Sequence, residues 1–516
     1  MTGGLAAIAG DEARRPQSIA AETQAEPTGQ RPNLLFIMTD QQRFDCLGAN
    51  GNPFIQTPNL DRLAKRSANL QNAFVQSPVC VPSRGCYFTG LYAHSHRNRV
   101  NYTPMERSEV FLQRMLRDAG YETACVGKLH LYPPTNAEAR RSGFNRVLLH
   151  DGAGRADPYS DYAKWRGERD PNKDVHYRAY SPDVAPGKNP FRAVIADEFT
   201  DTTWTGLKTR ETLTELAAQT KPFFLFTSFW KPHSPYEVSV PFDSMYDDVE
   251  IPLPRPWTLD EIRNKPLPVQ KQILRFKPQY AIDRKRLQWI YRSYYASVSH
   301  IDREVGSILT ALEQAGLAEN TVIVFASDHG DQLLEHGLLE KNVLYEGSIH
   351  VPMLVCFPGH VKPGRYDDLV ESVDLLPSLF ELLGLAEPKH AQGAGFASLI
   401  ADRGGAYEPK TAVFSENVIP EVLTRPSNMT YRFEKGQGIA GIRHPDAKMV
   451  RTRRWKYCHY PEGYAELFDL QNDPNEEQNL SADAKHRATL DELKERIMHW
   501  LITADETRQI AERWLL

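Results

Sequence analysis

Short apolar runs separated by amphipathic segments give this chain its pattern. Residues 33–38 are apolar after the first position and lead into Thr39 and Asp40, which is typical of a buried strand in a parallel sheet. We predict four further strands of this kind, at residues 121–127, 222–230, 321–326 and 352–357.

The amphipathic segments between these runs predict helices. In residues 58–70, Leu60 and Leu63 recur at helical spacing, while Thr57 can cap the segment and Pro58 suits its first position. Further helices are expected at residues 110–119, about 283–315 and 373–383.

Alternation of strands and helices predicts an α/β fold with a mixed, mostly parallel central sheet sandwiched by helices. Ligands of such sheets bind at the carboxyl ends of the strands. Asp40, Lys128 and Asp328 each follow a predicted strand at that end. We therefore expect a site at this edge.

The pattern also divides the chain. Residues 1–31 are expected to form a disordered tail, residues 32–400 the catalytic α/β domain, and residues 401–516 a smaller α+β lobe with a short antiparallel sheet. Residues 151–198 and 238–281 break the alternation and are expected to be long surface insertions that shape the site.

Composition narrows the class of protein. The 516 residues are 41% hydrophobic and 25% charged, as in an ordinary globular enzyme, and the net charge of −5 argues against a nucleic-acid partner. We see no apolar stretch of the roughly 18 residues that a membrane span needs, and no export signal, so we expect no membrane association and a cytoplasmic location. The sequence leaves the oligomeric state open, a homo-oligomer included.

Cys80 stands out among the six cysteines because it opens the run Cys-Val-Pro-Ser-Arg. Arg84 lies one helical turn further on, so both side chains can face one pocket if a helix begins there. The free amides of such a helix start would face an anion. The alternative is a buried structural cysteine, which is the expectation for the other five.

Two dipeptides offer ligands for a divalent cation. Asp40 and Gln41 follow the first predicted strand, and Asp328 and His329 follow another. Three hard oxygen donors and one imidazole at neighbouring strand ends make a plausible site. Alone, each dipeptide is more often a turn or a helix cap.

Four basic side chains complete the candidate site. Lys128 and His130 would point to the same side of an extended chain, where the lysine can hold an anion and the histidine can act as a base. His233, between two prolines, and Lys341 are candidates to bind the ester oxygen and protonate a leaving group. Alone, each would be an unremarkable surface residue.

Together these motifs resemble the sulfatase branch of the alkaline-phosphatase superfamily. The Cys-x-Pro-x-Arg run matches the signature of that family, and supporting runs occur in the family's order. These are Thr57-Pro58-Asn59-Leu60-Asp61-Arg62-Leu63-Ala64, Thr89-Gly90-Leu91-Tyr92, Gly127-Lys128-Leu129-His130, Val373-Asp374-Leu375-Leu376-Pro377 and Leu467-Phe468-Asp469-Leu470.

The resemblance implies a role for each candidate. Cys80 becomes formylglycine (3-oxoalanine), made by a maturation enzyme, and serves as nucleophile and metal ligand. The resemblance further implies that Asp40, Gln41, Asp328 and His329 are metal ligands and that Arg84 supports the nucleophile. It implies that Lys128 and Lys341 hold the sulfate group, and that His130 and His233 transfer protons.

Two departures place the chain near choline-sulfatase-like enzymes and the phosphonate monoester hydrolases. Gln41 stands where typical sulfatases have a second Asp, and His329 where they have Asn. Both changes shift the expected metal from calcium, the family default, toward manganese. Asn101 resembles a substrate-contacting residue of the phosphonate hydrolases, whereas the run around Lys128 has the sulfatase form.

The resulting hypothesis is a metal-dependent sulfuric ester hydrolase that acts on a small-molecule or saccharide sulfate ester. The alternative within enzymes is a phosphonate monoester or phosphodiester hydrolase that uses the same residues. A third reading is a non-catalytic anion-binding relative in which Cys80 is never oxidised.

Overall fold

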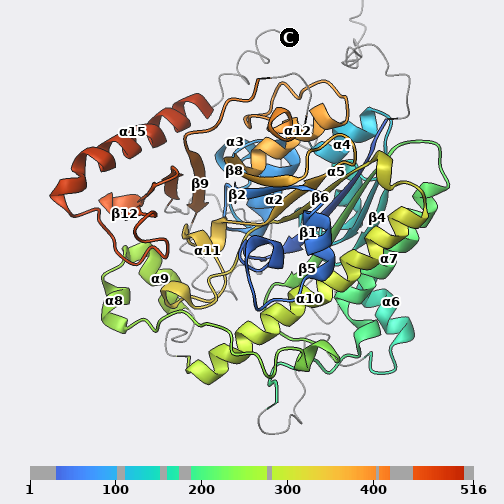
Figure 1. Cartoon of the computed structure of the whole chain (residues 1–516), viewed down its shortest axis with the longest axis horizontal. Coiled ribbons are helices and arrows are strands. Elements are labelled where there is room, and N and C mark those ends of the chain that lie inside the picture. Colours follow the sequence, from blue (N-terminus) through green and yellow to red (C-terminus); the bar gives the residue numbers. More distant parts are fainter. Residues whose placement is uncertain are drawn as a thin grey trace, which may run out of the picture.

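The computed structural model describes residues 31–101, 111–151, 160–173, 188–275, 282–401, 406–418 and 446–504. The tail predicted for residues 1–31 lies outside this part apart from Arg31, and so do sections of the two predicted insertions and of the C-terminal lobe. Figure 1 shows how the described elements are arranged.

An eight-stranded sheet forms the centre of the protein, in the order β4-β3-β5-β1-β6-β7-β2-β8. Only β7 runs against its neighbours, so the sheet is mixed and mostly parallel, as the sequence predicts. The strands are β1 (Asn33–Asp40), β2 (Ala68–Phe74), β3 (Glu122–Gly127), β4 (Arg146–Leu149), β5 (Phe223–Pro232), β6 (Thr321–Ser327), β7 (Met353–Cys356) and β8 (Gly364–Glu371).

Strands β1, β3, β5, β6 and β7 are buried on both faces, which explains why these strand segments are mostly apolar. In β1, Phe36 and Met38 enter one core, while Leu35 and Ile37 enter the other. Because successive side chains of a strand alternate between faces, a strand that lies between two cores has few polar positions.

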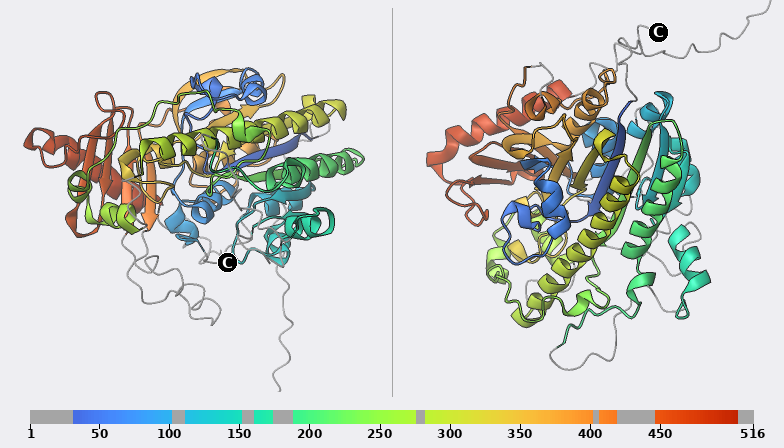
Figure 2. Two further views of the ribbon diagram at one scale, coloured as in Figure 1. Left: turned by 90° about the horizontal axis from the view of Figure 1, so that it is seen from below. Right: turned by 45° about the vertical axis from the view of Figure 1, so that its right-hand side comes forward.

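Helices cover both faces. The helices α10 and α7 pack on the face that Leu35 and Ile37 enter, while α2, α4 and α12 cover the other (Figures 1 and 2). Within the described residues the helices are α1 (Pro58–Ala64), α2 (Cys80–Thr89), α3 (Ala93–His96), α4 (Leu112–Asp118), α5 (Asn136–Ser142), α6 (Asp161–Arg169), α7 (Asp201–Ala217), α8 (Leu259–Arg263), α9 (Leu267–Arg275), α10 (Arg284–Gln314), α11 (Glu346–Ile349), α12 (Leu375–Leu382), α13 (Ala397–Ile400) and α15 (Arg487–Ala504). None of these helices combines the length and the apolar character that crossing a membrane would require.

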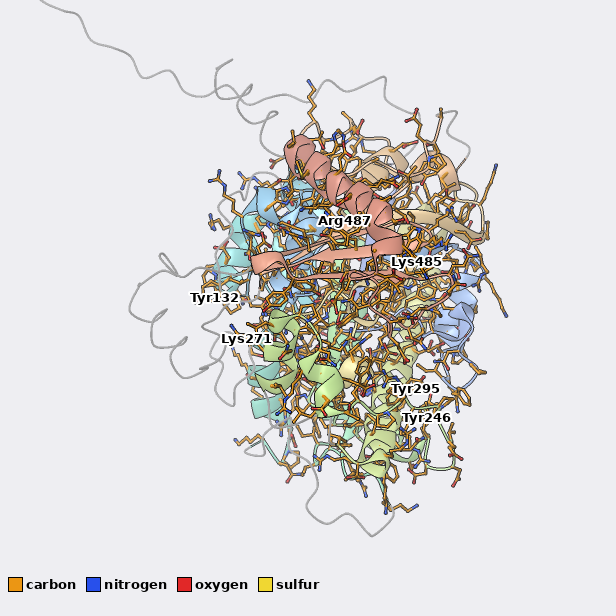
Figure 3. The ribbon with its side chains drawn as sticks, turned by 90° about the vertical axis from the view of Figure 1, so that its left-hand side faces the viewer. Tyr132, Tyr246, Lys271, Tyr295, Lys485 and Arg487 are labelled. Carbon is orange, nitrogen blue, oxygen red and sulfur yellow. The ribbon has the colours of Figure 1, made fainter. Side chains whose placement is uncertain are left out.

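The C-terminal elements form a second, smaller layer, drawn in red on the side away from β4 (Figure 1). Four antiparallel strands, in the order β12-β11-β10-β9, pack under α15 (Figure 3). These strands are β9 (Val413–Val418), β10 (Asp446–Arg451), β11 (Trp455–His459) and β12 (Ala465–Asp469). The expected short antiparallel sheet is confirmed.

The described parts of the two predicted insertions touch each other and α10. Arg192 and Val238 form a parallel bridge, in which the Val238 amide donates to Phe191 O at 3.1 Å. Tyr246 packs edge-on against Tyr295 of α10, with ring centroids 5.9 Å apart (Figure 3). The segments 188–198 and 238–251 therefore join one cluster over the first half of α10.

One predicted element is wrong in part. The helix predicted for residues 58–70 ends at Ala64, and Ala68 begins β2, which pairs with both β7 and β8. The alternation in β2 was hidden because Asn69 and Gln71 are polar yet buried. Pairing with distant strands determined the structure of residues 68–70, although their local pattern favoured a helix.

Gly127 ends β3 at a position that excludes a side chain. Its φ is 93°, and a Cβ there would lie 2.0 Å from Ser228 O of β5. We expect Gly127→Ala to lower the free energy of unfolding by on the order of 3 kcal/mol or more, because the clash is with backbone. Chemical denaturation followed by circular dichroism measures the loss.

The matched control is Gly120→Ala. Gly120 has a φ of 95° with no atom within 4 Å of an added Cβ, so only backbone strain remains, about 1–2 kcal/mol. Equal losses for the two variants would show that β5 can yield at Ser228.

Candidate active site and metal centre

The candidate residues follow four neighbouring strands at one edge of the sheet. Asp40 ends β1, Lys128 follows β3, His233 follows β5 and Asp328 follows β6. Because these strands are adjacent in the order β3-β5-β1-β6, their carboxyl ends present all four side chains to one place. The expectation of a site at this edge agrees with the geometry.

Cys80 is the first residue of α2, whose start faces this edge. Its Sγ lies 3.1 Å from His329 Nε2 and 3.9 Å from Asp40 Oδ1, and its side chain is 1% exposed. Burial and the Asp40 charge raise the pKa of the thiol, but the charges of Lys341 and Lys128 outweigh them and lower it. The site therefore favours negative charge at this atom.

Asn101 lies beside the same helix start. Its side-chain Oδ1 accepts a hydrogen bond from the Val81 amide at 3.0 Å. Val79, at the cap position, provides no side-chain acceptor, so Asn101 satisfies one of the amides that a helix start leaves free. The sequence indicated Asn101 as a substrate contact and did not predict this hydrogen bond to the helix start.

Four buried side chains bring potential metal ligands together. One ligand atom from each of Asp40, Cys80, Asp328 and His329 lies within 4.8 Å of the other three. The His329 Nδ1–H donates to Gly330 O at 3.0 Å, so Nε2 is the ring nitrogen that faces the cluster. Burial lowers the pKa of His329, but the charges of Asp328 and Cys80 outweigh it and raise the pKa, so a cation bound at Nε2 would displace a proton. Two carboxylates and an imidazole oriented in this way fit a divalent cation.

Gln41 places its amide beside this cluster. Its Nε2 donates to Asp331 Oδ2 at 2.6 Å, and its Oε1 accepts from Lys341 Nζ at 2.5 Å. The backbone amide of Gln41 donates to Asp328 Oδ1 at 3.1 Å. The side-chain oxygen is therefore the atom of the amide that could serve as a further hard ligand.

Arg84 contacts the carboxylates of both Asp328 and Asp40. Its Nε donates to Asp328 at 2.8 Å, and one terminal nitrogen lies 3.4 Å from Asp40. The other terminal nitrogen donates to Lys128 O at 2.5 Å and to Ser228 Oγ at 3.0 Å. With no exposed surface, this guanidinium fixes the carboxylates rather than binding solvent.

Lys128 is buried and forms an ion pair with Asp40, while its Nζ lies 4.1 Å from the ring centroid of Trp230. Burial raises the pKa of Asp40, but the charges of Lys128 and Lys341 outweigh it, so the pKa falls well below its usual range. Asp40 therefore stays ionised, which a metal ligand requires.

The chain from Lys128 to His130 is not extended, as the prediction assumed, although both side chains lie near the charged cluster. Gly127 has a φ of 93° and His130 a φ of 54°, so the chain turns here instead of extending. Burial, then the charges of Lys128 and Arg84, lower the pKa of His130 well below its usual value. His130 is thus a neutral imidazole near the charged cluster, held by two 2.9 Å contacts from its amide to Asp151.

His233 and Lys341 form a direct pair. The His233 Nδ1–H donates to Ser234 O at 2.6 Å, so its Nε2 accepts from Lys341 Nζ at 2.5 Å. Burial and the Lys341 charge lower the pKa of His233 well below its usual value. Burial opposes the charge on Lys341, yet the charges at Cys80 and Asp40 raise its pKa. The proton of this pair belongs to the lysine.

Sequence reasoning missed Asp331 and Asp151. Asp331 is fully buried and accepts hydrogen bonds from Gln41 and from Tyr236. Burial raises the pKa of Asp151 to about 6. The sequence offered one indication for Asp331, because it is a second acid three residues after Asp328. Asp151 belongs to no motif that would have indicated it.

Sequence comparisons find sulfatases among the relatives of this chain. The family model described as Sulfatase matches residues 32–385. An arylsulfatase from Clostridium perfringens is 31% identical over 494 residues, which cover 90% of this chain and 93% of that protein. A choline-sulfatase from Rhizobium meliloti is 26% identical, with 94% of this chain and 91% of that protein covered.

Solved structures agree in fold. The phosphonate monoester hydrolase from Silicibacter pomeroyi superposes with a TM-score of 0.78 at 23% identity, covering 92% of this chain and 96% of that chain. The superposition includes the C-terminal layer, because coverage extends well beyond residues 32–385. The architecture is that of the alkaline-phosphatase superfamily.

The donor set generates a prediction about metal dependence. Chelation should abolish turnover, and Asp328→Asn should weaken metal binding at least about tenfold, because one carboxylate is lost from a closely spaced set. Manganese should restore the chelated protein at least as well as calcium, since His329 contributes a nitrogen donor. Metal titration followed by an activity assay measures both.

An Asp302→Asn variant serves as the control. Asp302 is buried and accepts hydrogen bonds from Asn59 and from the Leu60 amide, away from the candidate ligands. Full activity after chelation would refute the metal site, and a clear calcium preference would refute the weight given to the imidazole.

Proposed function

The chain belongs to the sulfatase family, and from this premise we propose that it hydrolyses sulfate esters through a nucleophile derived from Cys80. Its class is that of the sulfuric ester hydrolases. The observation that carries the proposal is the position of Cys80, at the start of α2 and within 4.8 Å of three ligand side chains. A separate maturation enzyme would oxidise the thiol to formylglycine.

Formylglycine and a divalent cation supply chemistry that the unmodified chain lacks. Hydrated formylglycine offers two hydroxyl groups on one carbon, one to attack sulfur and one to expel sulfate afterwards. A cation held by Asp40, Gln41, Asp328 and His329 would supply positive charge beside the nucleophile and the sulfuryl oxygens, with manganese favoured over the family's usual calcium.

Lys128 and Lys341 are positioned to hold the sulfuryl oxygens. Both contribute positive charge at Cys80, and both lower the pKa of Asp40, so both lie close to these two side chains. Ammonium groups fixed before the substrate arrives stabilise developing negative charge without reorganisation. Arg84 is committed to Asp328 and Asp40, so its role is to support the nucleophile's surroundings.

Lys341 donates the proton to the departing alcohol, and His233 holds Lys341 in place. The His233 lone pair points at Lys341 Nζ, so His233 has no proton of its own on that side. This assignment divides the leaving-group role between the two residues. In the second step the neutral His130 accepts the proton of the remaining hydroxyl, which releases sulfate and regenerates the aldehyde.

A second candidate function is the hydrolysis of phosphonate monoesters or phosphodiesters. Gln41 in place of a second carboxylate and His329 as a nitrogen donor favour it, because fewer negative ligands leave more of the cation's charge for a phosphoryl oxygen. The third possibility, a non-catalytic anion binder, requires that Cys80 stays a thiol.

Cys80 provides the direct test. Intact-protein mass spectrometry should show a mass about 18 Da below that of the thiol form, and Cys80→Ala should retain less than about a hundredth of the turnover. Turnover of matched aryl sulfate and aryl phosphonate esters should favour the sulfate by kcat/KM.

Cys86→Ala is the control for the loss of a buried thiol from the same helix. A sample with an unmodified Cys80 and full activity would remove formylglycine from the mechanism. A preference for the phosphonate ester would establish the second candidate function.

The Lys341–His233 pair predicts a dependence on the leaving group. Lys341→Ala and His233→Ala should both steepen the fall of kcat/KM with leaving-group pKa, since alkyl alcohols need a proton and nitrophenolate hardly does. Because the two residues share one proton, the double variant should be little worse than Lys341→Ala. Rates across a series of sulfate esters measure the slopes.

His130→Ala should behave differently, with a burst of alcohol followed by slow turnover, because its role lies in the second step. Equal losses across all leaving groups for the Lys341 and His233 variants would mean that the pair only binds sulfate.

A further inference from the structure

Gln41 raises a question that a carboxylate ligand would not raise. A carboxylate presents oxygen whichever way it is turned, whereas an amide presents either an acceptor oxygen or a donor NH2 group. A cation can bind the oxygen alone. Some neighbouring group must therefore decide which end of the Gln41 amide faces the site.

Asp331 is that neighbour. Its Oδ2 accepts from Gln41 Nε2 at 2.6 Å, which turns Gln41 Oε1 toward Lys341. The reversed amide would set two oxygens against each other at Asp331 and two donors against each other at Lys341. Both contacts therefore favour one orientation, and Asp331 has no exposed surface through which water could compete.

Asp331 also ties together the segments that carry other site residues. Tyr236, three residues after His233, donates its hydroxyl to Oδ2 at 2.9 Å. The amide of Glu340, next to Lys341, donates to Oδ1 at 2.9 Å, as does the Leu333 amide. One carboxylate thus accepts four hydrogen bonds from three parts of the chain.

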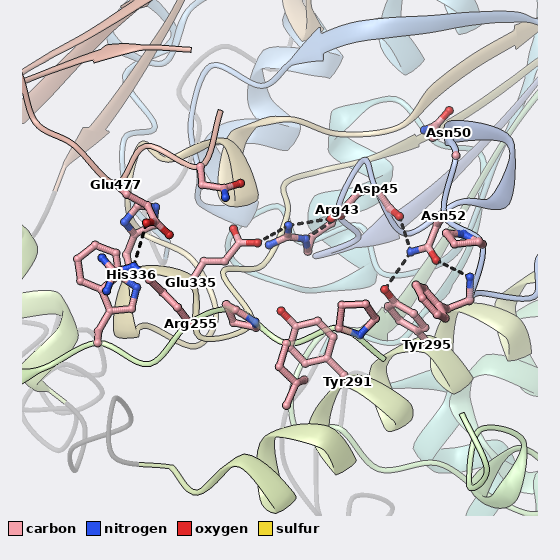
Figure 4. A pocket seen from close by; sticks show the side chains of 18 residues that line it. Arg43, Asp45, Asn50, Asn52, Arg255, Tyr291, Tyr295, Glu335, His336 and Glu477 are labelled. Carbon is pink, nitrogen blue, oxygen red and sulfur yellow. Dashed lines mark hydrogen bonds and ion pairs between the residues drawn. The ribbon is translucent and has the colours of Figure 1, made fainter. Parts of the chain in front are cut away.

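Arg43 fixes Asp331 itself. It donates to Asp331 O at 2.9 Å, while its guanidinium lies between Asp45 and Glu335, at 2.8 Å from each (Figure 4). The carboxylate of Asp331 is therefore anchored on its backbone side by a charged group outside the ligand cluster. Tyr236, Leu333 and Glu340 hold the carboxylate itself, in addition to Gln41.

We propose that Asp331 is the positioning residue that selects the oxygen-inward orientation of the Gln41 amide and thereby makes Gln41 a metal ligand. The inference rests on the proposed function, because it presupposes the metal site. On this proposal, Asp331 compensates for the presence of Gln41 where typical sulfatases have a second Asp. An amide can replace that carboxylate as a metal ligand only if a fixed acceptor binds its NH2 group on the side away from the metal.

The test exchanges the two side chains. In Asp331→Asn the Leu333 and Glu340 amides still need the side-chain oxygen, so the new NH2 group faces Gln41. The Gln41 amide should then turn and direct its own NH2 group toward the metal site. Combining Asp331→Asn with Gln41→Glu reverses the hydrogen bond, keeps the net charge and returns an oxygen to the site. Asp331→Asn alone should weaken metal binding, and the pair should recover it.

The measurement is Mn²⁺ binding to metal-stripped full-length protein by isothermal titration calorimetry, with kcat/KM as a second readout. Asp331→Asn should weaken Mn²⁺ binding by about tenfold or more, as losses around metal ligands do. The double variant should return to within about threefold of the parent protein. Asp302→Asn, a buried carboxylate away from the site, should lower the melting temperature without changing Mn²⁺ affinity.

Two results would overturn the inference alone: Mn²⁺ affinity unchanged in Asp331→Asn, or a double variant no better than Asp331→Asn. A parent protein that binds neither Mn²⁺ nor Ca²⁺ would overturn the metal site of the proposed function, and the inference with it. The first pair of outcomes leaves the proposed function standing, so the two failures are distinguishable.

Discussion

The buried contact between Arg84 and the carboxylates of Asp40 and Asp328 is the interaction on which the site depends. Two carboxylates without exposed surface would be very costly unless paired, and the guanidinium pairs both while also binding Lys128 O. Because Arg84 lies one turn after Cys80 on α2, the same contact fixes that helix against the ends of β1 and β6. Cys80 and the candidate metal ligands are thereby placed by a single charged group.

Much of this arrangement could be predicted from the sequence, because apolar runs buried on both faces left clear strand signals. The strand ends located Asp40, Lys128 and Asp328, and the order of motifs located Cys80 and Lys341. The edge strand β8 and the polar strand β2 escaped prediction, since β8 has exposed positions and β2 buries Asn69 and other polar groups. Their pairing partners lie far away in sequence, and local pattern does not report them.

What the sequence could not provide is orientation. The positive φ values near Lys128, the Nδ1–H tautomers of His233 and His329, and the direction of the Gln41 amide all follow from contacts with distant backbone or side chains. These details decide which atom donates and which accepts. They changed the expected role of His233 from proton donor to a group that holds Lys341.

The burial of Cys80 has a consequence for the timing of its chemistry. At 1% exposure, its thiol offers no access to the active site of another enzyme once the protein is folded. The helix α2 that carries Cys80 is also covered by α15, because Cys86 of α2 packs in the same cluster as Trp500 of α15. Oxidation would have to occur on the nascent or unfolded chain, and docking of α15, close to the carboxyl terminus, would end that interval. Under the proposed function, slower packing of α15 against α2 would leave more time for that oxidation.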